Sequence, residues 1–385
     1  MRETFLPYNL PEVGDDEAEA VLQTIRSRWI TRGPLTGQFE EALSEYLGGA
    51  RVVALSSCTA GLHLALLAAG IGPGDEVITT PYTFAASVNV IMHVGATPVL
   101  ADIEEDTGNL DPNLAEAAIT SRTRAIMPVH FAGHPADMEA FNELRDRYGV
   151  RIVEDGAHAL ASASQGRKVG TFGNLTAFSF YATKNLTTGE GGALVVPEAE
   201  MADRIRVLSL HGLSQNAWNR YSQKGSWHYD VKAPGFKFNM TDIEAAMGLR
   251  QLNKLDAMQN RRTALADRLS RGLAGLPVVL PTARPGVSHA WHLYPLRLRL
   301  DQLDGDRSQL IEALQDRNIG TSVHFIPIHF HSYYQSRMGW KRGQFPRAEA
   351  FFEAEVSLPL YPAMSFSDAD DVAAAVRDVL TPWLR

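Results

Sequence analysis

The sequence predicts an α/β fold: a mostly parallel, doubly wound sheet followed by a smaller α+β domain. Over the first two-thirds of the chain, short runs rich in β-branched residues alternate with helical patterns. Several of these runs are apolar at nearly every position, as expected for strands covered on both faces. Strand–helix alternation of this kind is typical of parallel sheets. After about Met240 a long helical pattern replaces the alternation.

Each element of the expected sheet follows from this pattern. The strands, in chain order, are Val52–Leu55, Glu76–Thr79, Thr97–Leu100, Ala125–Val129, Arg151–Glu154, Ala177–Tyr181 and Ala193–Val196. The helical patterns between them are Leu62–Ala69, Phe84–Val94, Asp111–Ala118 and Asp137–Tyr148. We therefore expect a large domain over residues 1–250.

The second part of the chain begins with a helical pattern from Thr241 to about Leu273. Thr241 and Asp242 are suitable capping residues, and Glu244 stands where a capping box needs an acid. The later elements are a strand at Trp291–Leu300, a helix at Arg307–Arg317, a strand at Gly320–Phe325 and a last helix from Ser367. They predict a small C-terminal domain over residues 251–385.

The composition excludes several classes of protein. Lys and Arg number 36 against 44 Asp and Glu, so the formal net charge is −8 over 385 residues, and no general nucleic-acid surface is expected. No apolar run approaches the roughly 18–20 residues of a membrane helix. The start of the chain turns acidic without an apolar stretch, unlike a secretory signal. The single cysteine, Cys58, excludes an internal disulfide and fits the cytoplasm.

Three motif-like features are not interpreted as functional. No Gly-x-x-x-x-Gly-Lys-Ser/Thr sequence is present, so no P-loop is expected. The glycines of residues 69–74 follow a helical pattern, which favours a helix end and a turn. His324, His329 and His331 lie close together, but no carboxylate stands among them, and no metal site is expected.

Two segments at the ends of expected strands suggest a ligand site. Residues 56–61, Ser-Ser-Cys-Thr-Ala-Gly, follow a strand and open a helix, where free N–H groups and the helix dipole favour a phosphate. A capped helix without a ligand fits them too. Residues 152–158 place Asp155 at the carboxyl end of a strand, where open α/β sheets bind ligands. A helix cap or a solvated loop is the alternative there.

A third segment, residues 178–185, contains Lys184 in apolar surroundings and precedes the Gly-rich residues 189–192. Desolvation would disfavour the ammonium and leave a nucleophilic amine able to form a Schiff base. Ser179, five residues earlier, offers a hydroxyl to a phosphate. A surface lysine lying along apolar atoms is the alternative. The fourth segment, residues 235–242, says little by itself.

Together these segments match the needs of pyridoxal 5′-phosphate (PLP). That cofactor needs a lysine for its aldehyde, an anion site for its phosphate and an acid for its ring nitrogen. It also benefits from an aromatic ring against its face, for which Phe84 is the candidate, with core filling as the alternative.

The chain resembles the DegT/DnrJ-type (StrS-like) sugar aminotransferases, PLP enzymes with the type I aspartate-aminotransferase-like fold. The resemblance runs from residues 29–34 (Trp-Ile-Thr-Arg-Gly-Pro) to residues 357–362 (Ser-Leu-Pro-Leu-Tyr-Pro). It is carried in between by residues 128–138, 178–192, 235–242 and 320–325.

The resemblance implies three catalytic residues. Lys184 would form the Schiff base with PLP, Asp155 would pair with the pyridine nitrogen, and His158 would lie near the phenolic oxygen. Many relatives carry Gln where this chain has His158. The His form is similar to enzymes that aminate C4 of UDP-4-keto sugars.

The resemblance also implies the remaining contacts. Thr59, Ala60 and Ser179 would hold the phosphate, Phe84 would stack on the ring, and Asn239 would reach over from the neighbouring subunit of a homodimer. The candidate substrate residues are Trp29, Arg220, Tyr221, His324 and His329. For the two histidines a structural role is the alternative, and for Arg220 and Tyr221 a solvated loop.

The implied reaction is a ping-pong transamination. L-glutamate would be the donor, and the acceptor a keto sugar, in particular C4 of a nucleotide-linked (UDP- or dTDP-) 4-keto sugar, in amino-sugar biosynthesis for a surface polysaccharide or a secondary metabolite. A keto-cyclitol acceptor, a PLP-dependent sugar dehydratase and a non-catalytic regulatory homologue are the alternatives. Lys184 counts against the dehydratases that carry His in its place. The set of Lys184, Asp155, Ser179 and Thr59 counts against a regulatory protein.

Overall fold

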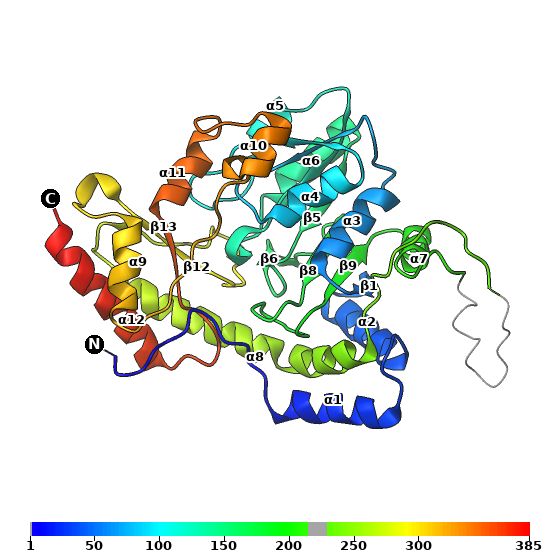
Figure 1. Cartoon of the computed structure of the whole chain (residues 1–385), viewed down its shortest axis with the longest axis horizontal. Coiled ribbons are helices and arrows are strands. Elements are labelled where there is room, and N and C mark those ends of the chain that lie inside the picture. Colours follow the sequence, from blue (N-terminus) through cyan, green and yellow to red (C-terminus); the bar gives the residue numbers. More distant parts are fainter. Residues whose placement is uncertain (1, 215–228) are drawn as a thin grey trace.

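The large lobe of the computed structural model is built on a seven-stranded sheet (Figure 1). The structure describes residues 2–214 and 229–385. The strand order is β1-β9-β8-β5-β4-β2-β3. The strands are β1 (Arg51–Leu55), β2 (Glu76–Thr79), β3 (Thr97–Leu100), β4 (Thr123–Met127), β5 (Arg151–Asp155), β8 (Leu175–Ser179) and β9 (Gly192–Val196). Only β9 runs antiparallel to its neighbours. The predicted mostly parallel α/β sheet is confirmed.

Helices cover both faces of this sheet. They are α2 (Pro34–Tyr46), α3 (Cys58–Ala68), α4 (Ala85–His93), α5 (Pro112–Ala117), α6 (Met138–Tyr148) and α7 (Ala199–Leu208), while α1 (Asp15–Ser27) packs outside them on α8 (Asp242–Leu273). Successive residues of β1 enter different apolar clusters, with Val52 and Ala54 on one side and Val53 and Leu55 on the other. Because side chains alternate along a strand, burial on both faces explains the uninterrupted apolar runs of the sequence.

One long helix, α8 (Asp242–Leu273), joins the large lobe to the small lobe. It begins at the predicted capping box, in which Thr241 and Glu244 satisfy each other's backbone N–H groups. Its Leu255 lies in an apolar cluster of the large lobe and its Leu269 in the core of the small lobe. The expected division between residues 250 and 251 falls inside this helix.

The small lobe is an antiparallel sheet with helices against it. Its strands, in sheet order, are β10 (Val278–Val279), β12 (Tyr294–Leu298) and β13 (Glu355–Leu358). Its helices are α9 (Arg307–Gln315), α11 (Pro346–Ala354) and α12 (Phe366–Leu380), whereas α10 (Ser332–Met338) packs on the large lobe, where the Tyr334 hydroxyl donates to Asn89 of α4 at 2.6 Å. A third small sheet has the order β11 (Val287–Ser288), β6 (Ala163–Ser164) and β7 (Arg167–Lys168). The single-turn helices are η1 (Phe131–Gly133), η3 (Leu300–Gln302), η4 (Ile328–Phe330) and η5 (Thr381–Trp383).

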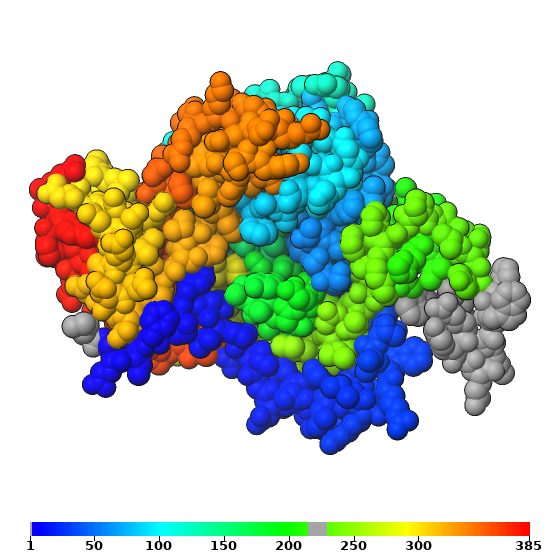
Figure 2. All heavy atoms as spheres, in the orientation of Figure 1, coloured from blue at the N-terminus to red at the C-terminus, as the bar shows by residue number. Residues whose placement is uncertain are grey.

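Two features of the small lobe differ from the prediction. The strand expected at Gly320–Phe325 is wrong, because this segment pairs only through an isolated bridge between Ser322 and Ser357. The first residues of the chain also pack on the small lobe, where the N–H of Leu6 donates to the carbonyl of Asn318 at 2.8 Å. Figure 2 shows this N-terminal segment in dark blue along the small lobe. Among the described residues, no helix is both long and apolar enough to span a bilayer.

Candidate active site

A cavity of about 550 Å³ lies at the carboxyl ends of the central strands. The ends of β1, β5 and β8 meet here because parallel strands place their carboxyl ends at one edge of a sheet. The predicted residues that line it are Thr59, Phe84, Asp155, His158, Ser179, Lys184 and His324. Six of these come from the large lobe, and His324 comes from the small lobe. The fold therefore gathers most of the predicted site from segments far apart in the sequence.

Asp155 is the last residue of β5 and is 5% exposed. The Ser87 hydroxyl donates to its Oδ2 at 2.8 Å, and the backbone N–H of Ala157 donates to its Oδ1 at 3.1 Å. The Cys58 thiol lies beside the same carboxylate. Burial, reinforced by Asp155, raises the pKa of that thiol, so Cys58 stays neutral. These contacts fix one carboxylate at the floor of the cavity.

Lys184 follows β8 in a turn and extends its amine into the same cavity. Burial lowers the pKa of this ammonium from 10.5 to about 8, although the Asp155 charge opposes the effect. About a tenth of the Lys184 side chains are therefore neutral amines at pH 7, far more than for a hydrated lysine. This is the nucleophilic state that the sequence predicts for Lys184.

The protonation of His158 follows from its contacts. The backbone N–H of Ala132 donates to Nδ1 at 3.2 Å, so Nδ1 carries a lone pair. Burial, aided by the Lys184 charge, lowers the pKa of His158 well below its usual value, and the ring stays neutral. Its proton must then sit on Nε2, which makes His158 a hydrogen-bond donor.

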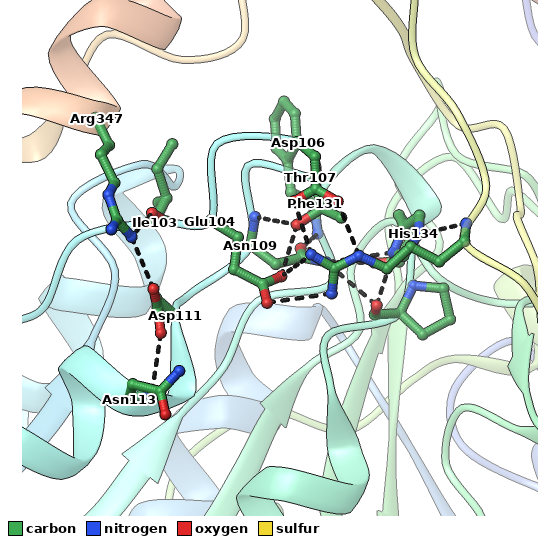
Figure 3. A network of polar contacts seen from close by, with 12 residues as sticks. Ile103, Glu104, Asp106, Thr107, Asn109, Asp111, Asn113, Phe131, His134 and Arg347 are labelled. Atoms are coloured by element: carbon green, nitrogen blue, oxygen red, sulfur yellow. Dashed lines mark hydrogen bonds and ion pairs between the residues drawn. The ribbon is translucent and has the colours of Figure 1, made fainter.

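A polar network holds the loop that contacts His158 (Figure 3). The Asn109 side chain accepts from the N–H of Phe131 at 2.8 Å and donates to the carbonyls of His134 and Pro135 at 3.1 and 3.2 Å. The N–H of Arg284 donates to His134 Nε2 at 3.3 Å. Because Ala132 lies between these anchors, the network fixes the backbone donor that orients His158.

The expected phosphate cradle is the N-terminus of α3. Ser57 is the N-cap, and its hydroxyl accepts from the N–H of Ala60 at 3.0 Å. Ala60 is therefore committed to the cap, whereas the N–H groups of Cys58 and Thr59 have no acceptor within the helix. Gly192 lies against this turn, since a Cβ there would stand 2.3 Å from the carbonyl carbon of Ser57. Only glycine permits such a close approach.

Phe84 and Ser179 line the open part of the cavity. Phe84 is 64% exposed, which excludes core filling as its role. Its ring faces that of Phe325, with centroids 6.1 Å apart. An exposed aromatic ring at the mouth and a hydroxyl beside the α3 turn are what a flat, phosphorylated cofactor requires.

The other predicted residues lie elsewhere in the structure. Trp29 lines a separate surface pocket. His329 is fully buried and pairs with Glu349 at 2.9 Å, away from the cavity. Asn239 is buried beside β1 and does not line the cavity of its own chain. Arg220 and Tyr221 lie outside the described residues.

His292 is a cavity residue that the sequence reasoning missed. The Asn185 amide donates to the carbonyl of Ala290 at 2.7 Å, so its Oδ1 accepts from His292 Nδ1 at 3.2 Å. Nε2 of His292 is then an acceptor, 3.4 Å from Lys184 Nζ. His292 lies in the connection between β11 and β12, and nothing in the neighbouring residues signals a contact with a lysine 108 residues away.

The residues present fit PLP. The cavity combines a partly deprotonated lysine, a fixed carboxylate, a donor histidine and a helix N-terminus with free N–H groups. Within residues 2–214 and 229–385, no group of three or more His, Cys, Asp or Glu side chains is arranged to hold a metal ion.

Comparison with known proteins agrees with this reading. The model of the DegT/DnrJ/EryC1/StrS aminotransferase family matches residues 11–377. The spore coat polysaccharide biosynthesis protein SpsC of Bacillus subtilis (strain 168) is 51% identical over 381 residues, 98% of each chain.

Solved structures agree as well. The putative sugar aminotransferase Spr1654 from Streptococcus pneumoniae, in its PMP form, has a TM-score of 0.91 at 36% identity, covering 97% of this chain and 98% of that chain. Helicobacter pylori PseC, an aminotransferase involved in the biosynthesis of pseudoaminic acid, has a TM-score of 0.91 at 30% identity, covering 99% and 100%. The predicted fold, transaminase class and PLP cofactor are confirmed.

Proposed function

The chain belongs to the DegT/DnrJ/EryC1/StrS aminotransferase family of PLP-dependent enzymes, and we propose that it moves an amino group from L-glutamate to C4 of a nucleotide-linked (UDP- or dTDP-) 4-keto sugar. It is a sugar aminotransferase of amino-sugar biosynthesis. The donor, the nucleotide and the aminated position are the proposed part.

One observation carries the catalytic assignment: Lys184 and Asp155 open into a single cavity, and the lysine pKa is lowered to about 8. A lysine must lose its proton to react with an aldehyde, whereas a carboxylate must keep its charge to hold a pyridinium proton. Burial of Lys184 serves the first need. The hydrogen bonds that Ser87 and Ala157 donate to the Asp155 oxygens serve the second.

When bound, PLP supplies an aldehyde that captures amino groups and a ring that accepts electrons from a breaking C–H bond. Asp155 would hold the proton on the ring nitrogen, kept in place by Ser87 and Ala157. His158 would donate from Nε2 to the phenolic oxygen. Lys184, once released, would carry the proton between the donor carbon and the cofactor as general base and then general acid.

The phosphate would rest on the N-terminus of α3. The free N–H groups of Cys58 and Thr59 and the hydroxyl of Ser179 would bind it, with Ala60 acting through the Ser57 cap. Phe84 would cover the exposed face of the ring.

Asn239 supports a homodimer with shared sites. Because it does not line its own cavity, a cofactor role for Asn239 requires a second copy of the chain. Mixing an Asn239→Ala subunit with a Lys184→Ala subunit should restore activity, since one of the two sites in the mixed dimer is intact. If the Asn239→Ala and Lys184→Ala proteins are each inactive and the mixture stays inactive after subunit exchange, Asn239 does not act in the partner's site.

The acceptor proposal rests on the likeness to enzymes of polysaccharide and pseudoaminic acid biosynthesis and on His158. Trp29 stays a candidate sugar contact only from a partner subunit, because it lies outside the cavity of its own chain. The cytoplasmic location and the lack of nucleic-acid partners stay predictions from composition.

A panel of acceptors tests the proposal. The holoenzyme with glutamate should form 2-oxoglutarate and consume UDP- or dTDP-linked 4-keto sugars, and Lys184→Ala should do neither. Turnover of a keto-cyclitol but of no nucleotide-linked keto sugar would show that the acceptor is a cyclitol. Loss of a sugar hydroxyl without 2-oxoglutarate would indicate a dehydratase, and no turnover with any acceptor would favour a regulatory role.

A further inference from the structure

A buried chain of polar side chains leads from the small lobe into the cavity. Glu355 and Ser357 lie on one face of β13, because side chains two residues apart on a strand point the same way. Ser357 Oγ contacts Glu355 Oε1 and lies 2.9 Å from Nδ1 of His324, which lines the cavity. Both Glu355 and Ser357 are completely buried. No step of the proposed transamination uses Glu355.

The His324 ring is held so that one nitrogen remains for the cavity. Its backbone N–H donates to Glu355 Oε2 at 3.0 Å, and the Tyr8 ring stacks on the imidazole with centroids 5.5 Å apart. Nδ1 faces Ser357, which leaves Nε2 for a ligand. Burial, aided by the Lys184 charge, lowers the pKa of His324 to about 4, so the ring is neutral and carries one proton.

The position of that proton follows from the state of Glu355. As a carboxylate, Glu355 only accepts, so the Ser357 hydroxyl donates to it, His324 Nδ1–H donates to Ser357, and Nε2 carries a lone pair. As a carboxylic acid, Glu355 donates from Oε1, since Oε2 faces an N–H group. Ser357 is then free to donate to Nδ1, and Nε2 carries the hydrogen.

Glu355 is the member of this polar chain whose charge changes near neutral pH. Burial raises its pKa to about 8, although Ser357, the His324 N–H and the Arg307 charge oppose the effect. The other titratable groups that face it are Tyr8 and Tyr82, whose phenols have pKa values raised by burial and remain neutral.

We propose that Glu355 is a positioning residue that sets, through Ser357, whether His324 presents a hydrogen or a lone pair to the sugar substrate. This inference rests on the proposed function for the identity of the ligand. A ketone oxygen only accepts hydrogen bonds, so the Nε2–H form suits the keto acceptor. The amino product can donate, so the lone-pair form suits it.

The test is the ring-nitrogen spectrum of His324 in ¹⁵N-histidine-labelled holoenzyme, assigned by its loss in His324→Gln. Between about pH 6.5 and about pH 9.5, Nε2 should change from the protonated to the unprotonated type, with its midpoint near the Glu355 pKa of about 8. In Glu355→Gln the amide donates at every pH, so Nε2 should stay protonated throughout. Glu349→Gln, which alters the separate pair with His329, should switch as the wild type does.

A constant tautomer in the wild type, or a switch that persists in Glu355→Gln, would overturn the proposal. Ser357→Ala gives a second test that does not depend on the folding of Glu355→Gln. In this variant the Glu355 carboxyl should still titrate in the infrared spectrum, while the tautomer of His324 should no longer change with pH. A tautomer that still changes at the Glu355 pKa also overturns the proposal.

These spectra need no substrate, so they separate this inference from the reaction itself. With an active acceptor, kcat/KM of the wild type divided by kcat/KM of Glu355→Gln at the same pH should be constant below about pH 8 and fall about 10-fold per pH unit above it. Parallel profiles would overturn the link to the substrate. A tautomer switch without turnover of any keto sugar would refute the proposed function alone.

Discussion

Replacing Lys184 by Met should stabilise the cofactor-free protein at neutral pH. The fold holds this ammonium in a place that lowers its pKa from 10.5 to about 8. At pH 7 the folded protein therefore carries a cost of up to about 3 kcal/mol that the unfolded chain, with its hydrated lysine, does not carry. Methionine has a similar length and no charge, so it removes the cost.

The sign of the pH dependence follows from the lowered pKa. Between about pH 8 and 10.5 the unfolded chain binds one more proton than the fold, so wild-type stability rises with pH through this window. The advantage of Lys184→Met should then shrink from about 3 kcal/mol at pH 7 to roughly 1 kcal/mol at about pH 9.5.

Urea unfolding of both proteins after cofactor removal, at equal protein concentration, measures this difference. Lys341→Met is the matched control, because the Lys341 side chain is exposed and the same substitution there removes no buried charge. An advantage of Lys184→Met that is equal at both pH values would refute the argument that the cavity desolvates Lys184.

Three further outcomes follow from the site. Asp155→Asn should lower kcat/KM about 100-fold, because a charge-assisted hydrogen bond contributes up to about 3 kcal/mol; a rate within twofold of the wild type would contradict this role. His292→Phe removes the acceptor 3.4 Å from the lysine amine and should lower kcat about 5- to 10-fold at unchanged KM, as steady-state kinetics would show. Gly192→Ala should lower the free energy of unfolding by about 1–3 kcal/mol, whereas Gly37→Ala, with open space around it, should not lower it. Equal urea midpoints for these two glycine variants would mean that the close approach to the α3 turn is not required.

The sequence predicted the features of the fold that depend on a pattern among neighbouring residues. Strands buried on both faces appear as apolar runs, and the capping box of Thr241 and Glu244 occurs where its spacing placed it. Lys184 and Asp155 were found because each follows such a run.

Contacts between distant segments could not be predicted in this way. His292 reaches Lys184 from the small lobe, and nothing in its neighbouring residues signals that contact. The segment before Phe325 looks like a strand, but only Ser322 forms a bridge, to Ser357. The next ladder bond is missing because the backbone N–H of His324 donates to the side chain of Glu355 instead of to a backbone carbonyl. Ala60 was expected at the phosphate, yet its N–H is needed by the Ser57 cap.

The 32 residues of α8 form one continuous helix about 48 Å long. The apolar cores of both lobes pack on different parts of this helix, so unfolding of either lobe would remove packing from the helix that supports the other. Calorimetry should therefore record one endotherm for the whole chain, and amide hydrogens in the middle of α8 should exchange only through global unfolding.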